Sequence, residues 1–213
     1  MRRSSTFLVL ALLVAAAPVH AQCVPGVPDP LQSTATWFNG PATACAVSPC
    51  PIPVFCPAGD VWATVLVTVL DCTGAPIAGI PACNVLLVSN GCNLFTPTSP
   101  CGPAAPYCAG GPTNALGQTR FRVSRAGGCC GGLRVVAQGI AIGPLLPYRS
   151  YDVNGDRKVT PLDTAVLAAA IGTCYPAPGY NKCVEFNCAP APFGCIDVAD
   201  LALFACHFGH GCQ

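Results

Sequence analysis

Residues 61–70, VWATVLVTVL, are the segment with the clearest secondary-structure pattern in the chain. Every second residue from Val65 to Val69 is a valine, and Leu66 and Thr68 fill the positions between them. Apolar residues at a period of two indicate a β-strand with one face in a core. The residues 71–74, Asp-Cys-Thr-Gly, are typical of a turn, so the strand is predicted to end near Leu70.

Further short strands are predicted on the C-terminal side of this segment. Val85–Ser89 is apolar, and Gln118–Val123 alternates apolar residues with arginines after an Asn-Ala-Leu-Gly turn. Leu133–Ala137 and Ile140–Ile142 flank a Gln-Gly pair, which predicts a hairpin. Short strands between turns over about 100 residues predict an all-β sandwich.

A family resemblance agrees with this pattern. Residues 61–142 contain VTVLDCTGAPIAGI, TNALGQTRFRV and LRVVAQGIAI in that order, and this arrangement resembles bacterial Ig-like modules of the invasin or adhesin kind. The resemblance implies a β-sandwich that serves as a spacer or a binding domain. We therefore expect an Ig-like domain over residues 22–148.

The residue inventory of this domain predicts that the protein is not an enzyme. Between Gln22 and Tyr148 there is no His and no Glu, and the carboxylates are Asp29, Asp60 and Asp71. A Ser or Cys nucleophile needs a neighbouring base, and a glycosidase needs two carboxylates that flank the scissile bond. The three aspartates are expected in turns or at the start of a strand.

Two ligand sites on the β-domain remain as alternatives. Four arginines, Arg120, Arg122, Arg125 and Arg134, could bind an acidic glycan, although their alternation with apolar residues fits a solvated strand face better. Three rings are candidate platforms for sugar stacking, although Trp62 fits a core position better. These rings are Trp37, Trp62 and Tyr107.

The N-terminus predicts export. Arg2 and Arg3 precede an apolar run, Phe7–Ala17, and small residues before Gln22 form a cleavage site, so residues 1–21 are predicted to be a signal peptide. The apolar run is too short to span a bilayer, which needs about 20 residues, and no membrane span is predicted. All seventeen cysteines follow the signal peptide, a density that is typical of an oxidising compartment and of a secreted or cell-surface protein.

The charge and cysteine counts limit the possible partners and the possible disulfide pairings. Eight basic and nine acidic residues follow the signal peptide, so no nucleic-acid partner is expected. Eleven cysteines lie within Cys23–Cys130 and six within Cys174–Cys212. Eleven cannot all pair internally, so either one thiol is free or one bridge crosses between domains or between chains. The adjacent Cys129 and Cys130 are expected to have different partners.

A calcium loop is predicted at residues 152–163, DVNGDRKVTPLD. Oxygen-bearing side chains stand at its first, third, fifth, ninth and twelfth positions, which is calcium-loop spacing because Ca²⁺ takes about six to eight oxygen ligands. A polar turn is the alternative. Arg157 stands where such loops prefer Gly, since φ is often positive there. The predicted ligands are Asp152, Asn154, Asp156, the carbonyl of Lys158, Thr160 and Asp163.

A helix and an internal repeat follow the loop. Thr160 can cap the helix, a proline suits its first position and Gly172 can end it. The segment 159–172, VTPLDTAVLAAAIG, aligns without gaps to 196–209, IDVADLALFACHFG. Val159 is expected to point inward and to pair with its counterpart in the second loop.

The second loop is predicted to be degenerate. Asp197 and Asp200 match the ninth and twelfth positions, but an ungapped loop places residues without side-chain oxygens, between Ala189 and Phe193, at the earlier ligand positions. Glu185 and Asn187 could serve only if the loop carries an insertion. The second loop is therefore expected to bind calcium weakly or not at all.

Cysteines and histidines surround this loop. Cys188 and Cys195 bracket it and are expected to lie in disulfides that hold it. The segment 206–212, CHFGHGC, is dense in ligands for zinc or copper. The alternative is a disulfide at Cys206 with both histidines on the surface, because an oxidised Cys cannot ligate a metal.

Two copies of half a calcium loop plus its helix resemble a type I dockerin over residues 150–212. The resemblance implies a small all-α domain at residues 149–213 that binds Ca²⁺ and docks onto a cohesin-like module of another extracellular protein. An accessory subunit of a polysaccharide-degrading complex, with a β-domain that binds or degrades carbohydrate, is the alternative. Apolar helix residues left exposed are the predicted partner site, namely Leu162, Val166, Leu167, Leu201, Phe204 and Phe208.

Overall fold

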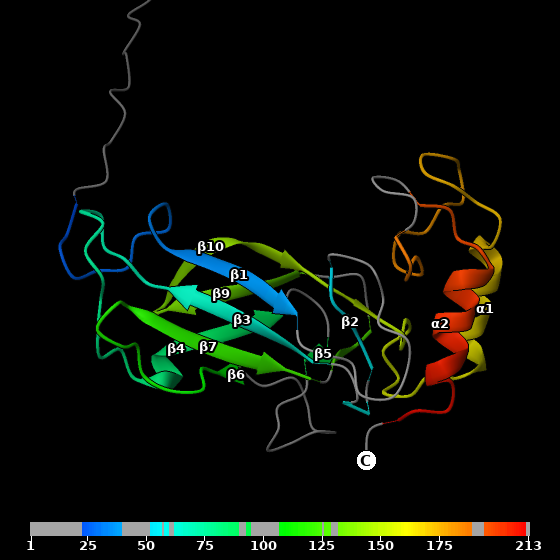
Figure 1. Ribbon diagram of the computed structural model, residues 1–213, viewed down its shortest axis with the longest axis horizontal. Helices are drawn as coiled ribbons and strands as arrows, with labels where there is room; N and C mark the ends of the chain where they lie inside the picture. The colour runs from blue at the N-terminus through cyan, green and yellow to red at the C-terminus, as the bar shows by residue number, and fades with distance from the viewer. Residues whose placement is uncertain are drawn as a thin grey trace, which may run out of the picture.

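The structure is a β-rich body with two short helices at its C-terminal end (Figure 1). It is a computed structural model that describes residues 23–39, 52–56, 58–59, 62–89, 93–94, 107–124, 126–128, 132–188 and 194–211. The predicted signal peptide, Asp60, Arg125 and the pair Cys129 and Cys130 lie outside these residues. No helix within them has the length and apolar character needed to cross a membrane.

Two antiparallel sheets enclose one core (Figure 1). The three-stranded sheet has the order β1 (Thr34–Asn39), β3 (Ala63–Thr68), β7 (Gln118–Val123). The four-stranded sheet has the order β10 (Ile140–Pro147), β9 (Gly132–Ala137), β4 (Val85–Ser89), β6 (Tyr107–Cys108). A short 3₁₀ helix, η1 (Ala82–Asn84), precedes β4.

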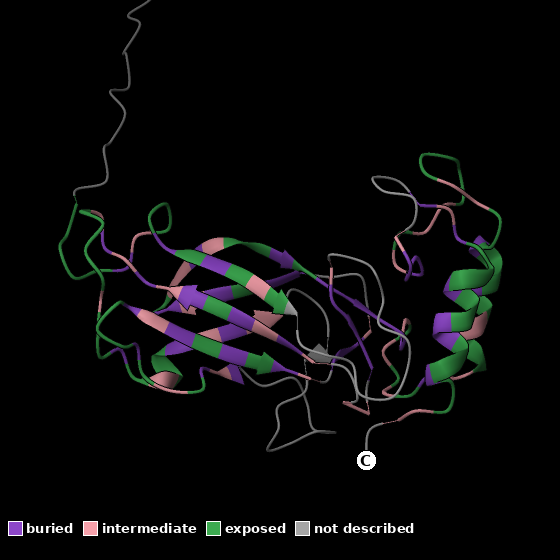
Figure 2. Cartoon of the chain, viewed as in Figure 1, coloured by how far each residue is buried: buried purple, intermediate pink, exposed green. Residues whose placement is uncertain are grey.

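The predicted alternation along the strands is confirmed. Val65 pairs with Phe121 in the register of β3 and β7, and both side chains are fully buried. Arg120 and Arg122 point to the exposed side of the same strand, and Figure 2 shows the buried and exposed bands that result. Full burial of one such Val or Phe side chain stabilises the fold by about 1.5–3 kcal/mol. A shift of the register by one residue would move these side chains to the exposed face, so their burial favours the observed register.

Two features of the sheets go beyond the predicted strands. β1 was not predicted, because its innermost apolar residue is the small Ala35; Trp37 nevertheless packs against the core and donates from Nε1 to the carbonyl of Pro147 (2.9 Å). β10 continues past Ile142, where the predicted strand ends, and its pairing with β9 resumes at Leu146 after a bulge. That bulge interrupts the period-two pattern on which the prediction depended.

Two pairs of short strands lie at the end of the sheets nearest the helices (Figure 1). β2 (Val54–Phe55) runs parallel to β11 (Arg149–Ser150), and β5 (Asn93–Leu94) is antiparallel to β8 (Ala126–Gly127). Phe55 packs in the core of the sheets, whereas Val54 and Cys56 pack in a second core with the helices. Residues 52–56 therefore contribute to both cores.

The helices are α1 (Pro161–Ala170) and α2 (Val198–His207). Each starts with a capping box, Thr160 with Asp163 in α1 and Asp197 with Asp200 in α2. The predicted cap at Thr160 is confirmed. Both capping boxes satisfy backbone N–H groups that would otherwise lack partners at the helix start.

The second core corrects two of the predicted partner-site residues. Leu167 and Phe204 are 0% and 1% exposed, so the expectation that these two residues remain exposed is wrong. They pack with Tyr151 and Phe186, which lie in the loops before the helices. The helical pattern alone does not show that these loops supply aromatic rings to cover the inner faces of the helices.

Disulfides link distant segments of the chain. Cys23 bonds Cys72, Cys83 bonds Cys108, and Cys174 bonds Cys195. The Cys174–Cys195 bridge joins the segment after α1 to the segment before α2. Cys188 and Cys206 are also disulfide-bonded. The expectation that Cys188 and Cys195 lie in bridges is thus confirmed in the structure.

Candidate functional site

The backbone around the closing aspartates shows that the two loops are copies of one motif. Asp163 Oδ1 accepts hydrogen bonds from the N–H groups of Val153 (2.7 Å) and Asn154 (2.9 Å), and Oδ2 accepts from Thr160 N–H (2.8 Å). The side chain of Asp163 therefore closes the first loop by holding its start against the helix cap.

Asp200 makes the equivalent contacts in the second loop. Its Oδ1 accepts from the N–H groups of Phe186 and Asn187 (2.9 Å), and its Oδ2 accepts from Asp197 N–H (2.9 Å). Between the two motifs the helix caps are 37 residues apart, whereas the loop starts are 33 residues apart. The second loop is thus four residues longer, and its insertion places Glu185 and Asn187 at the positions of Asp152 and Asn154.

The two motifs exchange backbone hydrogen bonds. Val159 N–H donates to the carbonyl of His210 (2.8 Å), and Gly209 N–H donates back to Val159 (2.9 Å). Ile196 makes the same two bonds with residues 172–173 (2.9 and 2.8 Å). Val159 points inward, as expected, and lies in the second core with its counterpart Ile196. The backbone of each loop, however, pairs with the turn that follows the other helix.

Three carboxylates converge in the first loop. Oxygens of Asp152, Asp156 and Asp163 all lie within 4.8 Å of one another. Asp152 and Asp163 are fully buried and Asp156 is exposed. The hydroxyl of Thr160 lies 3.1 Å from Asp163 Oδ2 and 3.5 Å from Asp156 Oδ2. Four of the six predicted ligands thus face one point.

The other two predicted ligands belong to the same turn of chain. Asn154 Oδ1 accepts from Asp156 N–H (2.9 Å), and its Nδ2 donates to Asp156 Oδ2 (3.1 Å). Lys158 forms a bridge with Gly211. Arg157 has a φ of +77°, as expected from its place in the loop, and its N–H donates to Asp152 Oδ2 (3.0 Å).

Burial is the main electrostatic influence on Asp152. It raises the pKa of Asp152 to about 6, against the backbone donors of Gly155 and Arg157, and the neighbouring Asp163 and Asp156 raise the pKa further. The ion pair found among the described residues, Arg149 with Glu185, lies beside the second loop and not beside these carboxylates. A site made only of oxygen donors, with excess negative charge, fits a hard cation such as Ca²⁺.

The second loop has a cation of its own. Glu185 is buried, and its carboxylate lies 3.7 Å from the guanidinium of Arg149, which is also buried. Arg149 further donates to the carbonyl of Glu185 and to Sγ of Cys188 (2.9 Å), and Tyr180 donates to the Glu185 carboxylate. Arg149 thus neutralises the acid at the first position of the second loop.

Sequence reasoning did not identify Arg149 as part of this site. It lies 36 residues before Glu185 and outside the repeated segment, so no spacing connects the two. Asp197 stays exposed at the helix cap, where Asn187 Nδ2 donates to it (3.2 Å). The predicted degenerate ligands Asp197 and Asp200 therefore serve as capping residues in this structure.

An apolar groove separates the two helices. Leu162, Leu201 and Phe208, which are predicted partner-site residues, are exposed, and Val166 is half-buried. The groove has a volume of about 600 Å³ and an almost wholly apolar lining. It is lined by Pro161, Thr164, Ala165, Ala168, Leu201, Phe204, Ala205 and Phe208.

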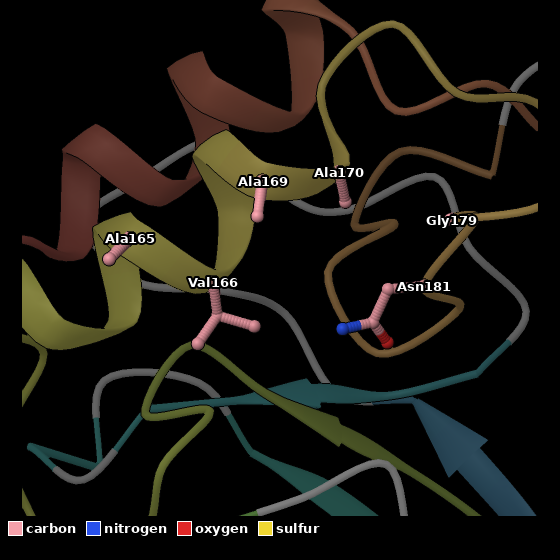
Figure 3. A pocket seen from close by; sticks show the side chains of 6 residues that line it. All are labelled: Ala165, Val166, Ala169, Ala170, Gly179 and Asn181. Atoms are coloured by element: carbon pink, nitrogen blue, oxygen red, sulfur yellow. The ribbon is translucent and has the colours of Figure 1, made fainter.

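A second hollow lies on the other side of α1. Figure 3 shows Val166 on the helix and Asn181 on the facing loop, with small side chains between them. Its volume is about 420 Å³. It is open and contains no charged side chain in its lining, so it extends the apolar surface around Val166.

The candidate carbohydrate platform is not formed as one surface. Tyr107 is buried in the core, with its hydroxyl donating to the carbonyl of Arg122 (2.6 Å). The guanidinium of Arg122 covers the ring of Trp62 at 4.6 Å, and Trp37 packs against the core. Arg120, Arg122 and Arg134 are exposed strand residues, as expected for a solvated face.

The C-terminal histidines differ from their predicted surface location. His207 is fully buried and stacks on Tyr151, with ring centroids 4.1 Å apart, whereas His210 is half-buried. The surface prediction is wrong for His207 because it ends α2 on the face that packs against the second core. Cys206 is disulfide-bonded, as that alternative required.

Comparisons of the chain with protein-family models, with curated proteins and with solved structures found no match. The function is therefore inferred from the loops and surfaces themselves.

Proposed function

We propose that the protein is an exported, non-catalytic docking protein whose first loop binds one Ca²⁺. In this proposal residues 149–213 form a dockerin-like unit that docks onto a cohesin-like module, and the two-sheet body is the Ig-like module that it presents. The main support is the contrast between the two loops. They share one backbone motif, but among the described residues the ion pair with a buried acid of these loops is that of Arg149 with Glu185, in the second loop.

The first loop supplies the ligands that the proposal needs. The carboxylates of Asp152, Asp156 and Asp163 face one point, and the hydroxyl of Thr160 lies beside two of them. The side chain of Asn154 and the carbonyl of Lys158 would complete the set. A bound Ca²⁺ would offset the repulsion among the three carboxylates, so metal binding would contribute to folding of this unit.

Calcium would also position α1, which forms one wall of the apolar groove. Thr160 and Asp163 form the capping box of α1 and are ligands in the proposed site. The start of α1 borders the apolar groove through Pro161 and Thr164. Fixing the loop therefore fixes one wall of the groove against Leu201 and Phe208 on the other wall.

Export and the lack of catalysis rest on broader features. The described disulfides fit an oxidising compartment. The two sheets around one core support an Ig-like sandwich, and residues 22–148 themselves contain no His and no Glu. The separated positions of Trp62 and Tyr107 give no support to a role in carbohydrate binding.

The docking role can be tested with the mature chain immobilised and exposed to the culture medium of the producing organism. We expect a partner to bind with Ca²⁺ present and to be released by a chelator. Phe208→Asp, at the exposed edge of the groove, should prevent capture. Val198→Asp is the matched control, because Val198 is 78% exposed and is not part of the groove lining. Equal capture by both variants, or capture unaffected by the chelator, would contradict the proposal.

A further inference from the structure

Three side chains with soft or borderline donor atoms meet beside the end of α2. Cys56 and His210 are 154 residues apart in the sequence, yet Cys56 Sγ lies 3.6 Å from His210 Nδ1. One donor atom from each of Cys56, His207 and His210 lies within 4.8 Å of the other two. The fold therefore assembles a cluster to which the sequence motif at residues 206–212 contributes only two members.

The turn after α2 brings the two histidines together. Gly209 has a φ of +82°, a conformation that suits Gly, and it turns the chain back across the helix end. His210 N–H then donates to the carbonyl of His207 (3.0 Å). The two rings are nearly perpendicular, with an angle of 83° and centroids 5.5 Å apart, so ring nitrogens from two directions approach one point.

The positions of the three donors are constrained by the surrounding structure. Cys56 directly follows β2, which pairs with β11, and its carbonyl accepts from Gly59 N–H (3.0 Å). The His207 ring stacks on Tyr151 at an angle of 19°. Cys56 and His207 are fully buried, and the carbonyl of His210 accepts from Val159 N–H (2.8 Å). Rigid support of this kind is what a metal ligand requires.

We propose that Cys56, His207 and His210 bind one Zn²⁺. In a tetrahedral site with Zn–S near 2.3 Å and Zn–N near 2.0 Å, the sulfur and nitrogen ligands are about 3.5 Å apart, close to the observed 3.6 Å between Cys56 and His210. The Cys56 thiol loses its proton to the solvent as the S–Zn bond forms. A water or a further donor takes the fourth position.

The donor set distinguishes this site from the calcium loop and favours zinc over copper. Ca²⁺ prefers oxygen ligands and would not bind a thiolate and two imidazoles. Copper sites built from one Cys and two His commonly add an axial methionine. The one methionine of the chain, Met1, lies in the predicted signal peptide.

The proposed zinc would join the two cores of the molecule. Cys56 lies in the segment 52–56, which contributes to both cores, while the histidines lie at the end of α2. One metal ion would therefore fasten the C-terminal unit to the β-rich body. It would also hold His210, which pairs with Val159 in the proposed calcium loop.

The experiment uses the intact mature chain with its disulfides formed and excess Ca²⁺ present. We expect one equivalent of Co²⁺ to bind and to produce thiolate-to-cobalt charge-transfer absorption with the visible bands of a tetrahedral ion, and Zn²⁺ should displace it. Cys56→Ser and His210→Asn should each abolish the spectrum. Cys183→Ser is the matched control, because Cys183 is half-buried and outside the cluster.

A second measurement covers the case in which Cys56→Ser fails to fold. His210 is only half-buried, so His210→Asn should retain the fold, as circular dichroism can verify. In the unaltered chain, alkylation of Cys56 should occur only after chelation of zinc, as read by peptide mass spectrometry. Finding Cys56 in a disulfide, or a cobalt spectrum that survives His210→Asn, would overturn the proposal.

Discussion

Single residues account for the different chemistry of the two loops, whose backbone hydrogen bonds follow the same pattern. Asp152 and Glu185 occupy the same place in the two motifs, and both are buried acids. Glu185 has the guanidinium of Arg149 beside it, whereas Asp152 accepts from backbone N–H groups and has the carboxylates of Asp156 and Asp163 nearby. In the proposed function a metal ion would offset the charge of the acids in the first loop, as Arg149 does in the second.

Replacing Arg149 tests this assignment. Arg149→Met should lower the free energy of unfolding by about 3–5 kcal/mol, because it leaves Glu185 as an unpaired buried charge. Urea unfolding of the mature protein measures the loss, and the double variant Arg149→Met/Glu185→Gln should recover much of it. Arg134→Met on the exposed face of β9 is the control, with an expected change within about 0.5 kcal/mol. Similar losses in both single variants would show that Arg149 has no special role.

Gly127 in β8 provides a second test at the residue scale. A Cβ at this position would overlap Oδ2 of Asp152, so Gly127→Ala should displace the carboxylate and weaken calcium binding by about tenfold or more, since each 1.4 kcal/mol is a factor of ten. Gly111→Ala is the matched control, because a Cβ there meets no atom within 4 Å. Calcium titrations of both variants give the comparison, and an unchanged affinity in Gly127→Ala would place the metal elsewhere.

Among the elements, those with a regular apolar period were predictable. The alternation in β3 and β7 and the capping residues of α1 could be read from the sequence, because each depends on neighbours in the chain. β1 and the bulged half of β10 could not, since Ala35 gives a weak apolar signal and the bulge shifts the period. The burial of Phe204 was also missed, because the rings that cover it come from loops distant in sequence.

In the candidate site, too, features that depend on neighbouring residues were predictable and those that depend on distant residues were not. The spacing of carboxylates in residues 152–163 predicted their convergence, because all ligands lie in one turn of chain. Arg149 and Cys56 could not be assigned, since they reach their partners Glu185 and His210 across 36 and 154 residues. Contacts of that range depend on the complete fold, which no local pattern contains.

The turn after β3 gives a prediction for how the stability of the fold depends on pH. The hydroxyl of Thr73, and then the N–H of Gly26, lower the pKa of Asp71 from 3.8 to about 2. A lowered carboxyl pKa stabilises the fold above pH 3.8, and this contribution is lost as the pH falls through about 2. Asp71→Asn should therefore lower the melting temperature at neutral pH, and the difference from the unaltered protein should shrink below pH 3.8. A difference that stays constant with pH would contradict this role for Asp71.

At the scale of the whole molecule, the C-terminal unit and the β-rich body share structure. Gly128 N–H donates to the carbonyl of Asp152 (2.6 Å), β11 pairs with β2, and residues 52–56 contribute to both cores. Each of the two loops also pairs with the turn after the other helix. Order in the first loop should therefore support the second repeat and the edge of the sheets, even though the proposed metal contacts one loop.

Calcium titration calorimetry of the intact mature protein tests the central claim most directly. The account predicts one Ca²⁺ per chain. Asp152→Ala should abolish that binding, while Glu185→Gln, at the matching position of the second loop, should leave one ion bound if the variant folds, as judged by circular dichroism. Two bound ions would contradict the role of Arg149 in the second loop, and no binding, or binding that survives Asp152→Ala, would contradict the calcium site itself.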